Sequence, residues 1–229
     1  MFPIKDNIPS QKKPVINYLI IIINIIIFFY ELSLSIPELE KLINTYGFIP
    51  NKFKINFKNN KFSFETYKTL VTHMFFHGNL LHIFSNLWFL YIFGDNVEDE
   101  IGHIGYIIFY VTTGIGACLI QYIFDTTSNI PMIGASGAIS GVLGAYIVFY
   151  PRAKVLSLVP IFLLLPIPIP AIIFILLWFF FQVTNALTSL LIKTSNIAWI
   201  AHVAGFIIGY KIAKDIKKER EKKEGIHYL

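Results

Sequence analysis

The sequence predicts an all-α polytopic membrane protein, a bundle of six transmembrane helices. Of its 229 residues, 55% are hydrophobic and only 14% are charged, against roughly 25% charged residues in soluble domains. Alternating segments of about ten residues, typical of a membrane β-barrel, are not found in it. Six runs contain no Asp, Glu, Lys or Arg. The length of each is near or above that of a membrane-spanning helix, which is about 20 residues. They are Val15–Tyr30, Thr69–Gly94, Ile101–Phe124, Thr126–Pro151, Val155–Ile192 and Thr194–Tyr210.

The chain divides into residues 1–14, a cytoplasmic N-terminal segment, residues 15–210, the transmembrane domain, and residues 211–229, a basic cytoplasmic tail. The first apolar run is long and lacks a small-x-small cleavage site, so we interpret it as a helix rather than a signal peptide. A long outer loop follows, residues 31–68. Within it, Pro37–Asn44 has the apolar spacing of an interfacial helix.

The 38-residue run contains alternating prolines at its centre, Pro166, Pro168 and Pro170. Proline removes a backbone donor and disfavours helix in the residue before it. We therefore expect Val155–Pro170 to be irregular at the inner membrane face, and Ala171–Ile192 to form the fifth helix.

Basic residues concentrate after the last apolar run, where Lys211–Lys223 contains seven of them. This bias predicts cytoplasmic N- and C-termini and attraction to lipid head groups in a plasma (inner) membrane; a solvated charged helix is the alternative. The charge is not interpreted as a nucleic-acid site. The single cysteine, Cys118, permits no intramolecular disulfide.

With six crossings from an inside N-terminus, the second, fourth and sixth helices all start at the outer face. His82 and Asn86 then lie near the start of the second helix, Ser136 of the fourth and His202 of the sixth, all at similar depth. Small residues in both later helices allow close approach; they include Gly134, Gly205 and Gly209.

These residues favour nucleophilic catalysis. A serine hydroxyl needs an adjacent base, and His202 is the candidate for Ser136. We find no carboxylate to orient the histidine at this depth, so we predict a Ser–His dyad. His82, the Asn86 amide and the Ser136 backbone N–H are the available donors for an oxyanion.

Structural alternatives exist for each residue. Ser136 could pack helices, and His82 and Asn86 could form interhelical hydrogen bonds. His73 and His77, with His82 nearby, could bind a metal, but no HExxH motif or partner carboxylate accompanies them. We expect neither metal nor cofactor.

Four motifs resemble those of the rhomboid family of intramembrane serine proteases, over roughly Thr69 to Tyr210. The resemblance implies a Ser136 nucleophile, a His202 base, and an oxyanion site with His82 and Asn86. It further implies transmembrane protein substrates cleaved at small residues in or near the bilayer, and a movable fifth helix capped by residues 193–196 that admits them. The motifs are His73–Asn86, Gly94–Gly102, Gly134–Gly137 and Ala201–Gly205 with Gly209.

Two positions depart from the family pattern. Thr69 stands near where the family often has an arginine that anchors the first outer loop. Ser140 stands where many members have an aromatic residue against the catalytic histidine. A catalytically silent rhomboid-like protein that binds client helices is the alternative function. A transporter would show mid-membrane charges and inverted repeats, which the sequence lacks.

Overall fold

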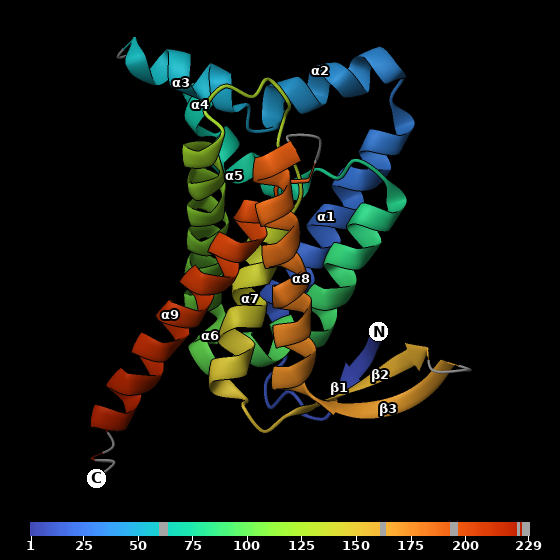
Figure 1. Ribbon diagram of the computed structural model, residues 1–229, viewed down its shortest axis with the longest axis vertical. Coiled ribbons are helices and arrows are strands. Elements are labelled where there is room, and N and C mark those ends of the chain that lie inside the picture. The colour runs from blue at the N-terminus through green and yellow to red at the C-terminus, as the bar shows by residue number, and fades with distance from the viewer. Residues whose placement is uncertain (60–63, 161–163, 193–196, 224, 226–229) are drawn as a thin grey trace.

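The computed structural model describes residues 1–59, 64–160, 164–192, 197–223 and 225. Helices dominate this part of the chain, and one small sheet joins its N-terminus to its middle (Figure 1). The elements are β1 (Phe2–Asp6), α1 (Val15–Ser33), α2 (Ile36–Tyr46), α3 (Pro50–Lys58), α4 (Phe64–Tyr67), α5 (Thr69–Thr72), the 3-10 turn η1 (His73–Phe75), α6 (Leu80–Phe124), α7 (Ser136–Phe149), β2 (Lys154–Pro160), β3 (Leu164–Pro170), α8 (Ala171–Ile192) and α9 (Trp199–Lys223).

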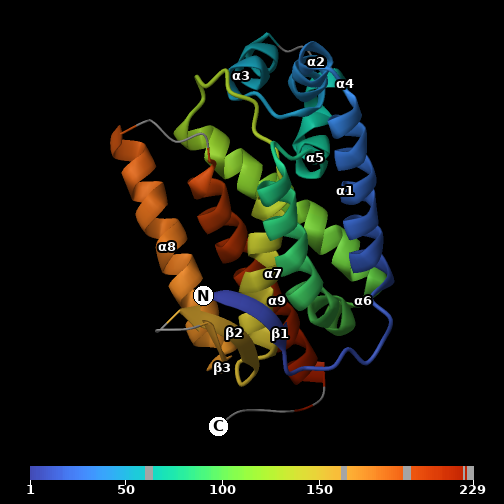
Figure 2. The same ribbon diagram turned by 90° about the vertical axis from the view of Figure 1, so that its right-hand side faces the viewer.

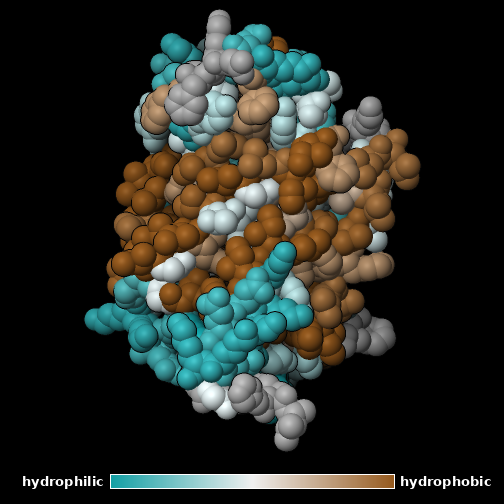
Figure 3. Space-filling view, turned by 90° about the vertical axis from the view of Figure 1, so that its left-hand side faces the viewer, coloured by the Kyte–Doolittle hydropathy of each residue, from teal (hydrophilic) through white to brown (hydrophobic). Residues whose placement is uncertain are grey.

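The membrane assignment is supported by helix length and by the surface. By length and composition, α1, α6 and α8 could each cross a bilayer, and α7 is a shorter apolar helix. On the visible face, hydrophobic residues fill the middle of the molecule between hydrophilic ends (Figure 3). The chain is therefore a helical membrane protein, whereas the number of crossings stays a prediction.

Helix α6 contains two of the predicted helices. Its 45 residues would extend about 68 Å at 1.5 Å per residue, more than twice the thickness of a bilayer core. Gly102 breaks it with φ +72° and ψ 167°. Glycine adopts a positive φ without the cost that other residues incur, so the chain reverses here and forms two legs (Figure 2).

Helices α7 and α9 are packed backbone against backbone. A Cβ added to Gly205 would lie 2.0 Å from the carbonyl oxygen of Gly137, and one added to Gly209 would lie 2.1 Å from that of Gly141. The residues of α7 from Gly137 to Ile147 are all buried. This contact confirms the predicted close approach of the fourth and sixth helices.

The start of α1 is fixed to α6 by Glu98, close to the break at Gly102. The Glu98 carboxylate accepts hydrogen bonds from the backbone N–H of Ile16, at 3.0 Å, and of Asn17, at 2.7 Å. An acidic group is favourable at a helix N-terminus, where N–H groups lack partners. His103 contacts the same carboxylate at 2.5 Å, so Glu98 ties three segments together at this end.

The expectation that Val155–Pro170 is irregular is wrong for the residues of this range that the structure describes, 155–160 and 164–170. β2 and β3 form an antiparallel hairpin, and β1 pairs with the other edge of β2. Prolines are tolerated because they occupy alternate positions of an edge strand, where the missing N–H groups lie away from β2. The prolines exclude a helix here, but they do not exclude an edge strand in which they occupy alternate positions.

Several helices differ in extent from the apolar runs. The second run, predicted from Thr69, first forms α5 and η1, and α6 begins only at Leu80. α7 begins only at Ser136, since the first ten residues of the fourth run form a loop. α9 continues through the basic segment to Lys223. The ends marked N and C lie toward the sheet, and α2 and α3 lie at the opposite end (Figure 1). The predicted helix at Pro37–Asn44 lies within α2.

Candidate active site

Ser136 is the first residue of α7. At 14 residues, this helix rises only about 21 Å, which is shorter than the roughly 30 Å bilayer core. The loop before it is held by the backbone N–H of Gly134, which donates to the His73 carbonyl at 2.9 Å. A short helix preceded by an inserted loop places the hydroxyl inside the bundle rather than at its surface.

His202 lies in the first turn of α9 and contacts Ser136. Its Nε2 is 2.7 Å from the Ser136 Oγ, a normal hydrogen-bond distance. The ring of Trp199 packs edge-on against the imidazole, with centroids 5.7 Å apart. The structure thus brings together the two residues that the sequence proposed as nucleophile and base.

A third group contacts this pair, and the sequence reasoning missed it. Gln182 of α8 is buried, and its Oε1 lies 2.9 Å from the Nδ1 of His202. The available signal was an amide within an apolar run, since a polar group inside a membrane needs a partner. Asn185 lies in the same run, so the sequence does not single out Gln182, and its inward orientation beside buried Ile175 and Ala186 is seen only in the structure.

His82 and Asn86 lie against the backbone of Gly134, two residues before Ser136. A Cβ added to Gly134 would be 2.7 Å from the Nε2 of His82 and 3.8 Å from the Nδ2 of Asn86. Gly134 also has φ +120°, so both space and backbone conformation favour glycine there.

Asn86 presents an unused donor at this place. Its Nδ2 is buried and has no hydrogen-bond partner within the described part of the chain. Leaving such a donor unsatisfied costs about 1–3 kcal/mol. This arrangement is suited to a group that becomes negatively charged during a reaction.

His77 lies beside His82 and Glu31. The rings of His77 and His82 meet edge-on at 5.0 Å, and the His77 backbone N–H donates to the Glu31 carboxylate at 3.2 and 3.3 Å. Glu31 is a buried carboxylate that the sequence reasoning overlooked at this depth. Among the described residues, no group of three or more His, Cys, Asp or Glu could hold a metal ion.

The two departures from the family pattern have local explanations. The Ser140 hydroxyl donates back to the Ser136 carbonyl at 2.6 Å, and Trp199 supplies an aromatic ring beside the histidine. Thr69 donates to the Thr66 carbonyl. The outer loop is joined instead by paired backbone hydrogen bonds between Phe48 and Met132. The predicted cap at residues 193–196 lies outside the described residues.

A small cavity of about 20 Å³ adjoins Ser136. It is comparable to the space that holds one water molecule. Its lining comes from η1, the second leg of α6, the loop before Ser136, α7 and the region at the start of α9: His73, Gly114, Ala117, Cys118, Met132, Ile133, Gly134, Ser136, Gly137, Ala198 and Ala201.

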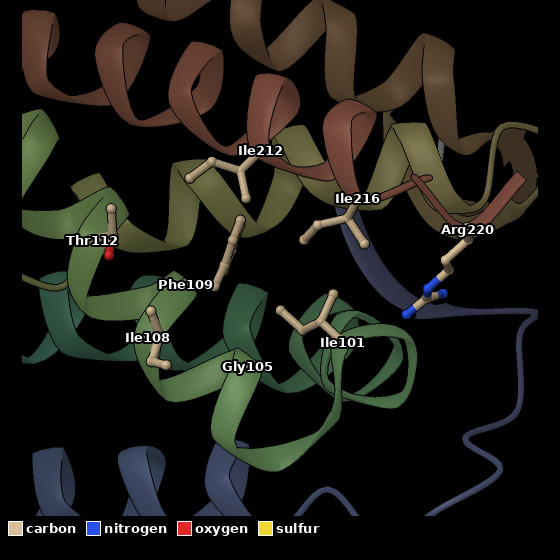
Figure 4. Close-up of a pocket in the computed structure, with 8 residues that line it drawn as sticks. All are labelled: Ile101, Gly105, Ile108, Phe109, Thr112, Ile212, Ile216 and Arg220. Carbon is tan, nitrogen blue, oxygen red and sulfur yellow. The ribbon is translucent and has the colours of Figure 1, made fainter. Parts of the chain in front are cut away.

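A larger groove of about 450 Å³ lies between the second leg of α6 and the later half of α9 (Figure 4). Arg220, at one end, is already paired with Glu100 at 2.5 Å. None of the predicted site residues lines it. The lining consists of Ile101, Gly105, Ile108, Phe109, Thr112, Ile212, Ile216 and Arg220.

Comparison with known proteins is consistent with this geometry. The Rhomboid domain family matches residues 65–216, which is more than half of the chain. The chain is 33% identical to Rhomboid-like protein 11, chloroplastic, of Arabidopsis thaliana over 60% of its own length and 43% of that protein.

Two further relatives have mitochondrial names. The chain is 24% identical to Rhomboid protein 1, mitochondrial, of Saccharomyces cerevisiae over 68% of the chain and 44% of that protein. It is 26% identical to RHOMBOID-like protein 12, mitochondrial, of Arabidopsis thaliana over 76% of the chain and 53% of that protein. These matches span about half or less of each relative. Together with the family match across both proposed catalytic positions, they show that the chain belongs to the rhomboid family.

Proposed function

We propose that this protein is an intramembrane serine endopeptidase that hydrolyses peptide bonds in or near transmembrane segments of other membrane proteins. The observation that carries the proposal is the 2.7 Å contact between Ser136 Oγ and His202 Nε2. It lies in a bundle whose other buried side chains are mostly apolar. A polar pair in such surroundings is costly, and a function accounts for it.

The proposed reaction is a two-step acyl transfer. His202 Nε2 takes the proton as Ser136 Oγ attacks the substrate carbonyl carbon. The carbonyl oxygen becomes an oxyanion that the Asn86 Nδ2, the His82 Nε2 and the Ser136 backbone N–H would stabilise. His202 then gives its proton to the leaving amine, and a water molecule activated by the same imidazole hydrolyses the ester on Ser136.

The cavity beside Ser136 supports a preference for small residues at the cleaved bond. A space of about 20 Å³ accommodates no large side chain. Replacing a small residue at that position of a substrate by leucine should lower kcat/KM at least roughly tenfold.

The test uses the full chain, purified in detergent or reconstituted in liposomes, with a fluorophosphonate probe and a model transmembrane substrate. The wild type should label and cleave, whereas Ser136→Ala should not label and neither Ser136→Ala nor His202→Ala should cleave. Ser189→Ala, a serine on α8 whose hydroxyl bonds its own helix, is the matched control and should behave as the wild type. A wild type that binds the substrate without labelling or cleavage would instead favour the silent, helix-binding function.

A further inference from the structure

We propose that Gln182 is the positioning residue for His202, so that the site is a Ser–His–Gln arrangement whose third member is carried by a separate helix, α8. The inference rests on the proposed function and names a group outside the predicted dyad. It starts from the 2.9 Å contact between Gln182 Oε1 and His202 Nδ1.

The contact selects one tautomer of the imidazole. A carbonyl oxygen only accepts hydrogen bonds, so the contact requires the proton to be on Nδ1. Nε2 then carries the lone pair and faces the Ser136 hydroxyl at 2.7 Å. That is the form in which His202 can remove a proton from serine. The opposite tautomer would direct an N–H at the hydroxyl and could not act as the base.

The amide performs this task without a charge. A carboxylate in the same position would have to be buried inside the membrane, which is expensive, whereas Gln182 is neutral and only 4% exposed. An unpaired buried amide would also be costly. One contact with His202 therefore both satisfies the Gln182 amide oxygen and orients the imidazole ring.

The three helices of the site are held together unequally. α7 and α9 touch through their backbones at Gly137 and Gly205, so Ser136 and His202 keep their relation. α8 meets α9 through side chains, such as the stacked rings of Phe179 and Phe206 with centroids 4.3 Å apart. An outward shift of α8 would therefore withdraw the acceptor from Nδ1 while leaving the serine and histidine in place.

Three variants of the full-length protein test the proposal. Gln182→Met keeps the side-chain length and removes the acceptor. Gln182→Glu keeps the acceptor and adds a charge. Thr188→Val is the control, because Thr188 is exposed on the same helix and its hydroxyl bonds only within α8 among the described contacts. The rate of fluorophosphonate labelling at Ser136, its pH profile, the KM and kcat for a model substrate, and the melting temperature are measured for each.

For Gln182→Met we expect a labelling rate and kcat roughly tenfold to a hundredfold lower, with KM unchanged, which is the effect of losing one buried hydrogen bond. Gln182→Glu should recover part of the rate. Its acidic limb should move to higher pH, because a carboxylate beside Nδ1 stabilises the imidazolium. Thr188→Val should match the wild type.

The proposal is overturned if Gln182→Met labels at the wild-type rate. It is also overturned if the Met and Glu variants lose rate equally and both melt earlier, since that pattern indicates a packing role. A wild type that does not label at all, in the same experiment, rejects the proposed protease function itself. Because the wild type is measured first, failure of the proposed protease function is distinguished from failure of the Gln182 proposal.

Discussion

At the scale of single residues, substitution of Asn86 distinguishes a catalytic role of its side chain from a structural one. Its Nδ2 has no partner within the described residues, so removing this amide should cost the fold no hydrogen bond, whereas an amide with a structural role would be needed for stability. In the proposed mechanism, Asn86→Leu should lower kcat roughly 10²- to 10³-fold without lowering the melting temperature. Asn185→Leu is the control, because that amide bonds the Phe181 carbonyl of its own helix. A variant that melts earlier but keeps kcat would point to interhelical bonding instead.

Asp6 predicts a dependence of stability on pH at the sheet end of the molecule. Burial raises the pKa of this carboxyl from 3.8 to about 6, although it accepts a hydrogen bond from the Tyr146 hydroxyl. Between these values the folded protein binds the proton and the unfolded chain does not, so stability falls as pH rises through this window. The loss levels off only once the carboxyl is fully ionised in the folded protein, at a pH above its pKa of about 6.

The measurement for Asp6 is the melting temperature in detergent from pH 4 to 7. Asp6→Asn cannot ionise, so it should gain stability relative to the wild type across the window and keep a constant advantage above it. Parallel curves for the two proteins would show that the native carboxyl titrates at its ordinary pKa.

At the scale of elements, the contact between α7 and α9 controls the site. Gly205→Ala would place a Cβ 2.0 Å from the Gly137 carbonyl oxygen, and overpacking of this kind costs roughly 1–3 kcal/mol. We expect both a lower melting temperature and slower labelling of Ser136, because the helices must separate. Gly105→Ala is the matched control, since its nearest neighbour would be 3.5 Å away. Equal effects of the two substitutions would contradict this.

The elements also show which predictions were accessible from the sequence. The fifth helix was predicted at Ala171–Ile192 and α8 has these bounds, because a proline-rich start and a long apolar run are local signals. The sheet was not predicted. β1 and β2 are separated by about 150 positions of chain, and no local pattern specifies pairing over such a distance.

At the scale of the whole molecule, sidedness can be tested by labelling cysteines. The native Cys118 is 1% exposed, so a membrane-impermeant maleimide should not reach it. Lys12→Cys and Lys214→Cys, both exposed near the sheet end, should label from one side of the membrane, and Glu40→Cys on α2 from the other. Labelling of all three from the same side would overturn the topology. The plasma-membrane assignment stays a prediction, and the relatives carry chloroplast and mitochondrial names.

The sequence by itself determined the membrane character, the helical class and the meeting of Ser136 with His202. The length of the apolar runs, the distribution of basic residues and the alternating direction of successive helices can all be read from the order of residues along the chain. The tertiary structure alone decided that Gln182 faces His202, that Glu31 accepts hydrogen bonds from the His77 backbone, and that Gly134 leaves room for His82. In lipid, an apolar helix is nearly equally hydrophobic on every side. Its rotation about its own axis is therefore set by packing against its neighbours rather than by a polar–apolar pattern.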